Sequence, residues 1–227
     1  MNTDKILKKT KEDYSIIASD FSEKRKYMWR DLKPFLKLIK PGDKVLDAGC
    51  GNGRLYKELK GKKIDYLGID FSKDLLRIAK KSNPGVGFRQ EDISKKKTWN
   101  CLKNYDVICC IAVLHHFPTK KEQLKVLRYI NIALEKNGLA IFSVWNLWQK
   151  RFWKLHFQQL VWKIFKGFKL KWILVPYKVT KDGKVIKIVN RFCYAFCPEE
   201  LEKIVKKAGF KIVKKEIGRN LCLDAKK

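Results

Sequence analysis

The chain has 227 residues and a formal net charge of +29, from 52 Lys and Arg against 23 Asp and Glu. Its length fits one domain with a full core, and its apolar runs are too short to span a bilayer, so we expect no stable membrane insertion. The charge favours a polyanionic partner, nucleic acid before anionic membrane, although lysines spread along the whole chain are also typical of a lysine-rich genome.

The seven cysteines are an odd number and stand mostly in apolar runs. They follow no N-terminal signal sequence, which predicts reduced thiols and a cytoplasmic protein. The pair Cys193 and Cys197 is too isolated to predict a zinc site, and we expect no metal in the functional site.

The first forty residues predict a helical cap. Residues 1–12 are polar and rich in lysine, residues 13–21 carry apolar side chains at helical spacing, and a second helix is expected at 32–39 before the Pro41-Gly42 turn. The aromatic and basic residues between these helices are suited to binding a substrate.

A strand followed by a glycine loop comes next, in residues 44–54. Gly49, Gly51 and Gly53 allow the backbone to turn sharply and let a ligand approach closely. The glycines alone fit a loop for either a dinucleotide or S-adenosylmethionine. Asp47 would repel a pyrophosphate but attract an ammonium group, and Asp70, at the end of the next apolar run, has the spacing of a ribose-binding carboxylate.

Apolar and helical segments then alternate up to residue 145. We expect strands at 44–49, 65–71, 86–91, 105–112 and 138–145, and helices at 53–60, 73–82 and 120–136. Strands separated by helices predict a parallel sheet, which makes 41–145 the expected cofactor-binding core. Asn137-Gly138 is expected to end the last helix as a left-handed cap.

Residues 146–191 interrupt this alternation with twelve Lys or Arg, one Asp and four of the seven tryptophans. A basic amphipathic helix is predicted there, with an apolar stripe made of Trp153, Phe157, Leu160, Val161, Ile164, Phe165 and Phe168. The stripe fits a lid packed on the core, a nucleic-acid surface or a membrane-surface helix. A hairpin is expected at 175–189, turning at 181–183.

The final segment, 192–227, predicts a helix at 198–208 and an antiparallel strand pair at 211–216 and 221–225. The whole chain, 1–227, is therefore expected to be one α/β domain with a seven-stranded sheet, in which 146–191 is an insertion after the fifth strand.

The motif Asp47-x-Gly49-x-Gly51-x-Gly53, with Asp70 and Glu91-Asp92, resembles those of class I S-adenosylmethionine-dependent methyltransferases. The resemblance implies a Rossmann-like sheet with helices on both faces, methyltransferase activity and S-adenosyl-L-methionine as cofactor, with Asp92 near the adenine amino group. The implied cofactor-binding residues are Asp47, Gly49, Cys50, Gly51, Asn52, Gly53, Asp70, Phe71, Asp92, Ile93 and Ile111.

A narrower resemblance rests on the segments at 14–25, 46–53, 111–117, 175–177, 191–196 and 208–210. They are similar to those of the tRNA wobble-uridine carboxymethyl methyltransferases, which esterify 5-carboxymethyluridine at the anticodon. By motif match, Arg25 and His116 would line the acceptor site. The resemblance implies that the partner is the anticodon stem-loop of tRNA. Eukaryotic members of this family work with a small zinc-binding activator subunit, and the sequence leaves open whether this chain requires one.

Chemistry agrees with this interpretation, because a guanidinium holds a carboxylate by two hydrogen bonds and an ionised acceptor needs no deprotonation. His115 and His116 follow the fourth strand, at the edge where open α/β sheets bind ligands. Two adjacent histidines do not both face a pocket in an ordinary turn, so one is expected to be structural. The alternatives are a methyltransferase for quinones or lipids and a non-catalytic RNA-binding module.

Overall fold

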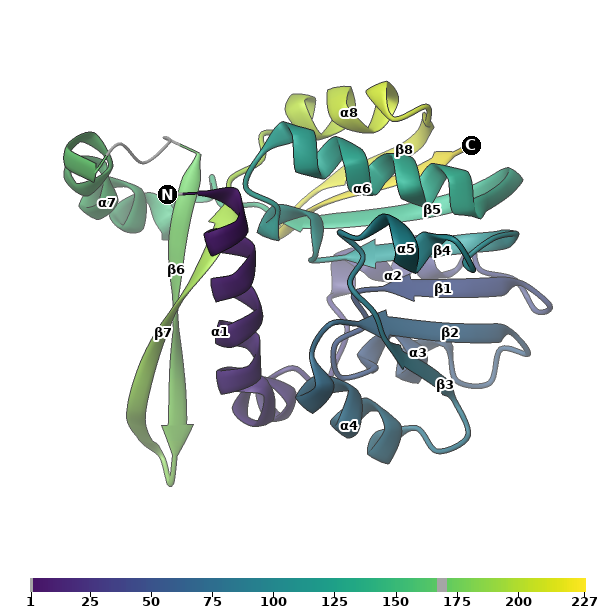
Figure 1. Cartoon of the computed structure of the whole chain (residues 1–227), viewed down its shortest axis with the longest axis horizontal. Coiled ribbons are helices and arrows are strands. Elements are labelled where there is room, and N and C mark those ends of the chain that lie inside the picture. Colours follow the sequence, from purple (N-terminus) through teal and green to yellow (C-terminus); the bar gives the residue numbers. More distant parts are fainter. Residues whose placement is uncertain (1, 167–170) are drawn as a thin grey trace.

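A seven-stranded sheet forms the centre of the computed structural model, which describes residues 2–166 and 171–227. The strand order is β3-β2-β1-β4-β5-β9-β8 (Figure 1). Strands β1 to β5 run parallel, and β9 is antiparallel to both β5 and β8. The strands are β1 (Lys44–Ala48), β2 (Asp65–Asp70), β3 (Gly87–Gln90), β4 (Tyr105–Ile111), β5 (Leu134–Trp145), β8 (Lys211–Ile217) and β9 (Asn220–Lys226). The predicted seven-stranded α/β fold is confirmed.

Side chains that alternate along the strands form two cores, one on each face of the sheet. Leu46 and Ile108 point to the face covered by α5 (Lys96–Trp99), α6 (Lys120–Ala133) and α8 (Pro198–Lys207). Val45 and Val107 point to the face covered by α2 (Lys33–Leu36), α3 (Arg54–Leu59) and α4 (Lys73–Ser82). Helices therefore cover both faces, as expected.

The predicted helix cap at Asn137-Gly138 is wrong. Helix α6 ends at Ala133, and β5 begins at once with Leu134, which is buried and pairs with Tyr105 of β4. Asn137 has the expected positive φ of 66° but lies within β5, where the pairing with β4 shifts register. Burial of Leu134 against the sheet outweighs the local turn signal of the Asn-Gly pair.

The N-terminal region is more helical than predicted at its start and less so at its end. Helix α1 (Thr3–Lys24) begins ahead of the expected residue 13, because Asn2 accepts a hydrogen bond from the Asp4 amide and Ile6 is fully buried. The second predicted helix is short: a single 3₁₀ turn, η1 (Arg30–Leu32), leads into α2.

The hairpin predicted after the fifth strand is confirmed and is longer than expected. Strands β6 (Trp172–Lys181) and β7 (Lys184–Tyr194) form a separate antiparallel sheet. Asp182 and Gly183 have φ values of 49° and 74°, as a two-residue type I′ turn requires. Figure 1 shows α1 standing between this hairpin and the main sheet, and α1 contacts β6, β7 and α4.

The basic helix α7 (Trp153–Lys166) follows a single 3₁₀ turn, η3 (Lys150–Phe152). Trp153, Phe157 and Leu160 are 60%, 77% and 40% exposed, so this part of the predicted stripe does not pack on the core as a lid would. The rest of the stripe, Val161, Ile164, Phe165 and Phe168, falls outside the side chains that the structure describes. No described helix has the length and apolar character needed to cross a bilayer.

Candidate active site

A cavity with about 1110 Å³ of space, open mouth included, lies between α1 and the carboxyl ends of β1, β2 and β4. This is the edge at which open α/β sheets bind ligands. Most of the predicted site residues line it: Arg25, Asp47, Gly49, Cys50, Gly51, Asn52, Asp70, Phe71, Asp92, Ile93, Ile111 and His116. Gly53 alone of the predicted set is not among the lining residues.

The glycine loop fits closely against its surroundings. Gly49 has a φ of 90°, and a Cβ added to it would lie 2.3 Å from a methyl group of Val113. Gly53, with a φ of 73°, starts α3, and a Cβ there would meet Asn83 at 2.9 Å and Phe88 at 3.0 Å. Gly49 therefore shapes the cavity wall, whereas Gly53 permits helix packing behind it.

Asp70 ties the loop to the end of β2. Its two carboxylate oxygens accept hydrogen bonds from the backbone amides of Gly51 and Ser72, each at 2.9 Å. Burial raises the pKa of Asp70 to about 6, although these amides lower it. Each oxygen keeps a further lone pair, so the carboxylate is fit to accept hydrogen bonds from the hydroxyls of a ribose.

Asp47 lies deeper, where the Tyr66 hydroxyl donates to its Oδ2 at 2.8 Å. Burial raises the pKa of Asp47 to about 7, and the nearby charge of Asp70 adds to this. Within the described residues its Oδ1 accepts no hydrogen bond. A buried carboxylate in this state gains most from a cationic ligand group such as an ammonium.

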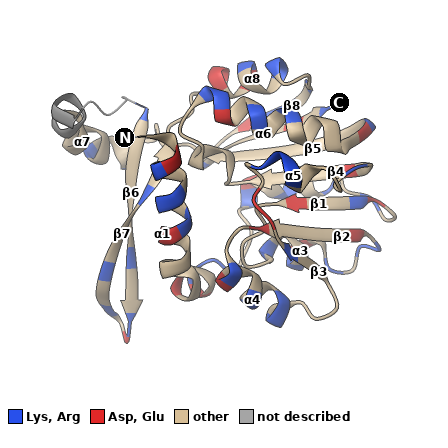
Figure 2. Cartoon of the chain, viewed as in Figure 1, with Lys and Arg blue, Asp and Glu red and all other residues tan. Residues whose placement is uncertain are grey.

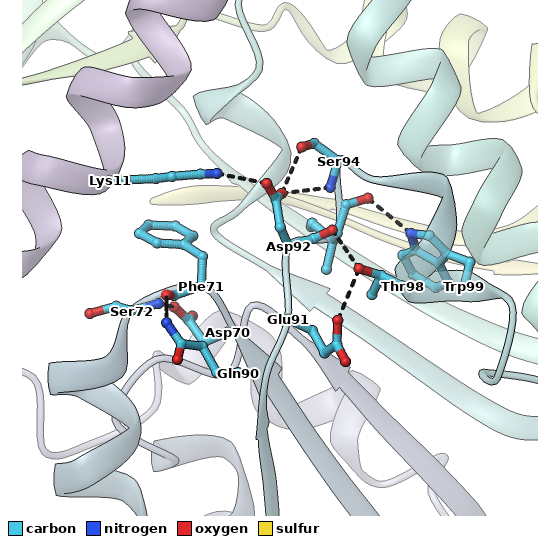
Figure 3. A network of polar contacts seen from close by, with 11 residues as sticks. Lys11, Asp70, Phe71, Ser72, Gln90, Glu91, Asp92, Ser94, Thr98 and Trp99 are labelled. Atoms are coloured by element: carbon cyan, nitrogen blue, oxygen red, sulfur yellow. Dashed lines mark hydrogen bonds and ion pairs between the residues drawn. The ribbon is translucent and has the colours of Figure 1, made fainter.

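Figure 3 shows how the third acidic residue, Asp92, is held. It accepts hydrogen bonds from the Ser94 amide and hydroxyl at 2.9 and 2.6 Å, and Lys11 reaches from α1 past the Phe71 ring to form an ion pair at 2.6 Å. Burial by itself would raise the pKa of Asp92, but these contacts outweigh burial and lower it. Sequence reasoning missed Lys11, because no local signal links α1 to this loop.

Two residues predicted to line the acceptor site, Arg25 and His116, both line the cavity, and the rings of Tyr14 and Trp145 lie 5.2 and 6.5 Å from that of His116. We call the part of the cavity lined by these four side chains the acceptor end, after that prediction. Nδ1 of His116 lies 2.9 Å from the Phe192 carbonyl oxygen, and Nε2 lies 2.9 Å from the Tyr14 hydroxyl. A carbonyl only accepts, so Nδ1 carries the proton and Nε2 accepts from Tyr14. Burial lowers the pKa of His116 to about 4, so the ring is neutral at pH 7.

The histidine pair divides as expected. His115 is fully buried and does not line the cavity, and its ring centre lies 4.9 Å from that of Trp145. Ligand atoms of His115, His116 and Cys193 lie within 4.8 Å of one another. Both nitrogens of His116 are already hydrogen-bonded, however, and the charge of Arg191 acts on all three residues. We assign no metal to this group.

Arg54 is a further cavity residue that sequence reasoning missed. It is the first residue of α3, directly after the glycine loop, and its guanidinium lies 4.0 Å from the centre of the Trp29 ring. Burial lowers its pKa to about 10, and its Nη1 atom is buried without a hydrogen-bond partner. The sequence did offer a signal for Arg54, because it directly follows the glycine loop, which was itself predicted to contact a ligand.

Comparison with known proteins decides the family. Residues 21–215 match the family described as a methyltransferase domain. The chain belongs to this family. It is 33% identical to an uncharacterized protein from Methanocaldococcus jannaschii over 89% of the chain and 76% of that protein.

This methyltransferase is also similar to enzymes named tRNA (carboxymethyluridine(34)-5-O)-methyltransferase. Identity is 33% with the Schizosaccharomyces pombe enzyme and 31% with the Saccharomyces cerevisiae enzyme, each over 60% of the chain. The matches span 57% and 47% of those two proteins.

Among solved structures, the fold matches a methyltransferase from Streptomyces caelestis with a TM-score of 0.70 and 14% identity, over 96% of the chain and 97% of that protein. It also matches 1,6-didemethyltoxoflavin-N1-methyltransferase from Burkholderia thailandensis, which was solved with S-adenosylhomocysteine, with a TM-score of 0.68 and 16% identity over 100% and 91%. The cofactor of this methyltransferase is S-adenosylmethionine. The buried carboxylates of Asp47 and Asp70 beside the close-packed Gly49 suit its ammonium and ribose groups.

Proposed function

We propose that this methyltransferase esterifies the carboxylate of 5-carboxymethyluridine at the wobble position of tRNA. The bound cofactor supplies a methyl group on a sulfonium. A carboxylate that receives this methyl becomes a neutral ester and releases no proton. The protein must therefore orient the acceptor and exclude water, and it needs no general base.

The acceptor end supports this proposal. The Arg25 guanidinium lines the cavity, where it would hold a carboxylate in a fixed plane. His116 is neutral, and both of its nitrogens are engaged, one by Tyr14 and one by Phe192. An imidazole in this state orients its neighbours and does not take a proton, which suits an acceptor that is already ionised. The names of the two yeast relatives agree with this chemistry.

The hairpin supports tRNA as the partner. Lys178, Lys181, Lys184 and Lys187 are exposed along β6 and β7, and the acidic residue between them is Asp182 at the tip (Figure 2). Exposed Trp153 and Phe157 on the neighbouring α7 offer surfaces on which bases stack. We infer that this side of the molecule contacts the RNA, and that the protein acts in the cytoplasm, where tRNA and reduced cysteines occur together.

Mass spectrometry of nucleosides tests the proposal. Transfer RNA that contains 5-carboxymethyluridine is incubated with the protein and S-adenosylmethionine, and the methyl ester is expected as product. Arg25→Ala should remove most turnover while cofactor affinity stays unchanged, and Arg25→Lys should rescue poorly because a point charge does not fix the carboxylate plane. Methylation confined to a neutral amine, a phenol or a quinone would overturn the proposal in favour of a small-molecule methyltransferase.

A further inference from the structure

Arg191 on β7 carries a positive charge that nothing in the described structure balances. The residue is 3% exposed, and its Nε and Nη1 atoms are buried without hydrogen-bond partners. It forms no ion pair with any described residue. A buried guanidinium without a counter-ion is unfavourable, so this position is suited to binding an anion.

The surroundings of Arg191 hold it in place and supply no negative charge. Its guanidinium lies 4.8 Å from the centre of the Trp145 ring and 4.9 Å from that of Tyr177. One acid, Asp13, senses the charge of Arg191, but it is paired with Lys9 at 2.6 Å. Aromatic rings stabilise a cation and fix the plane of the guanidinium, and the Tyr14 hydroxyl accepts a hydrogen bond from it, but its Nε and Nη1 groups have no acceptor among the described residues.

Arg191 borders the acceptor end of the cavity. Trp145, which stacks against it, lines the cavity, and the carbonyl of the next residue, Phe192, accepts the hydrogen bond from His116. Its charge also acts on Arg25: burial lowers the pKa of Arg25, and Arg191 lowers it further. Arg25 and Tyr14 line the cavity, whereas Arg191 is not itself among the lining residues but contacts Tyr14 and Tyr177. The charges of both guanidiniums therefore act on the same part of the cavity.

We propose that Arg191 and Arg25 together form an anion site that binds the carboxylate of the acceptor. This inference rests on the proposed function for the identity of the acceptor, but the anion site itself follows from two guanidiniums that form no ion pair with any described residue and from the unpartnered Nε and Nη1 of Arg191. Two cationic groups around one carboxylate would discriminate strongly against a neutral analogue. They would also bind the neutral ester less tightly than the acid, which favours release of the methylated product.

Calorimetry on the protein saturated with S-adenosylhomocysteine tests this site. The ligands are the nucleosides 5-carboxymethyluridine, its methyl ester and 5-carbamoylmethyluridine. Wild type is expected to bind the acid about tenfold to a hundredfold more tightly than the amide or the ester, as charge-assisted hydrogen bonds allow. Arg191→Met should lose most of this preference while binding the amide as wild type does, and Arg191→Lys should keep part of it.

Lys211→Met is the matched control, because this lysine is exposed on β8 and does not line the cavity. Thermal unfolding and S-adenosylhomocysteine affinity report whether each variant folds. If Arg191→Met does not fold, Arg191→Lys with the same three nucleosides carries the test. An unchanged preference for the acid in a folded Arg191 variant, or no preference in wild type, would overturn the inference.

A second probe separates this inference from the proposed function. Sodium acetate, compared with sodium chloride at equal ionic strength, should raise the melting temperature of wild type more than that of Arg191→Met. If acetate stabilises only wild type but no ester appears in tRNA, the anion site stands and the tRNA assignment fails. If tRNA is esterified equally well by wild type and by Arg191→Met, the tRNA assignment stands and the anion site fails.

Discussion

At the scale of single residues, two buried carboxylates that line the cavity, Asp47 and Asp70, ionise less readily in the ligand-free protein than they would in water. Asp47 and Asp70 have pKa values raised by burial to about 7 and about 6. These carboxylates can bind cationic and hydroxyl groups, and a bound cofactor would lower the free-energy cost of ionising them in the buried site. Ligand affinity and pH are therefore linked.

Cofactor affinity should fall as the pH falls below about 7. An ammonium ligand favours ionised Asp47, so affinity weakens by about tenfold per pH unit while this one group is protonated. The stability of the ligand-free protein changes with pH in the opposite direction. Because the pKa of Asp47 is raised in the folded state, the free energy of unfolding decreases as the pH rises from 3.8 towards about 7. Calorimetry between about pH 5 and pH 8 measures the affinity.

Asp47→Asn should weaken binding and flatten this pH dependence, whereas Asp65→Asn, a change at the exposed far end of β2, should leave both unchanged. A pH dependence in Asp47→Asn equal to that of wild type would remove Asp47 from the cofactor site.

Asp70→Ala should lower cofactor affinity roughly tenfold or more, because hydrogen bonds to a charged acceptor disappear. The structure adds a second effect, because Asp70 also accepts from the Gly51 amide and holds the glycine loop. Asp70→Asn keeps one acceptor oxygen and should show a smaller decrease. Equal affinity in wild type and a folded Asp70→Ala variant, measured by calorimetry, would contradict the assignment.

Among the helices and strands, α1 is the element that closes the site, and one carboxylate fastens it to the hairpin. Asp20 accepts hydrogen bonds from the Tyr177 hydroxyl at 2.6 Å and from the Thr180 amide and hydroxyl at 3.0 and 2.8 Å. Lys24 pairs with it at 2.8 Å. Because α1 also carries Lys11, Tyr14 and, at its end, Arg25, the hairpin positions both ends of the cavity through Asp20.

Asp20→Ala should destabilise the protein by about 2–4 kcal/mol, since it removes several hydrogen bonds to a charged, buried group. Burial alone would raise the pKa of Asp20, but the bonds from Lys24, Tyr177 and Thr180 hold it below its ordinary value of 3.8. Its contribution is therefore present above pH 3.8 and declines as the pH falls below that value. Urea denaturation measures the change.

Glu23→Ala, which removes an exposed carboxylate from the same helix, is the control and should leave the free energy of unfolding nearly unchanged. If Asp20→Ala were as stable as this control, the hydrogen bonds of Asp20 would not be what holds α1 against the hairpin.

Over the molecule as a whole, the positively charged residues are not confined to one face. Figure 2 shows Lys and Arg on α1, α4, α6 and α8 as well as on the hairpin. A general basic surface attracts RNA without fixing its orientation. The hairpin differs because its lysines accompany the exposed side chains of Val185, Ile186 and Ile188 and lie next to α1, which lines the cavity.

Affinity for tRNA should fall steeply with salt, and the hairpin should set much of the slope. Replacing Lys178, Lys181, Lys184 and Lys187 by Gln should flatten the plot of log affinity against log salt by about 0.7–0.9 for each phosphate that is no longer neutralised. The matched control replaces Lys37, Lys40, Lys57 and Lys60, which are exposed on and beside α2 and α3. Filter binding at several salt concentrations measures both slopes.

An equal change in the two quadruple variants would show that no one face is used. Sedimentation with anionic vesicles, together with no tRNA affinity at low salt, would instead favour a membrane-bound substrate.

The strands, the glycine loop and the acidic residues at the strand ends could all be predicted from the amino-acid sequence. These features are encoded over a few neighbouring residues, by alternation of apolar side chains and by glycines that need positive φ. The end of α6 was misjudged, because the same local reasoning does not weigh burial of Leu134 beside β4 against the turn preference of Asn137.

Which side chains meet across the cavity became known only from the folded chain. Lys11 and Asp92 are 81 residues apart, Tyr14 and His116 are 102 apart, and Asp20 and Tyr177 are 157 apart. No local pattern specifies such pairs. They form because α1 packs between the hairpin and α4, and the cost of leaving buried polar groups unpaired then selects their partners. The Arg191 guanidinium, which forms no ion pair with a described residue, became visible in the same way, since it packs against Trp145 and Tyr177 from two other strands.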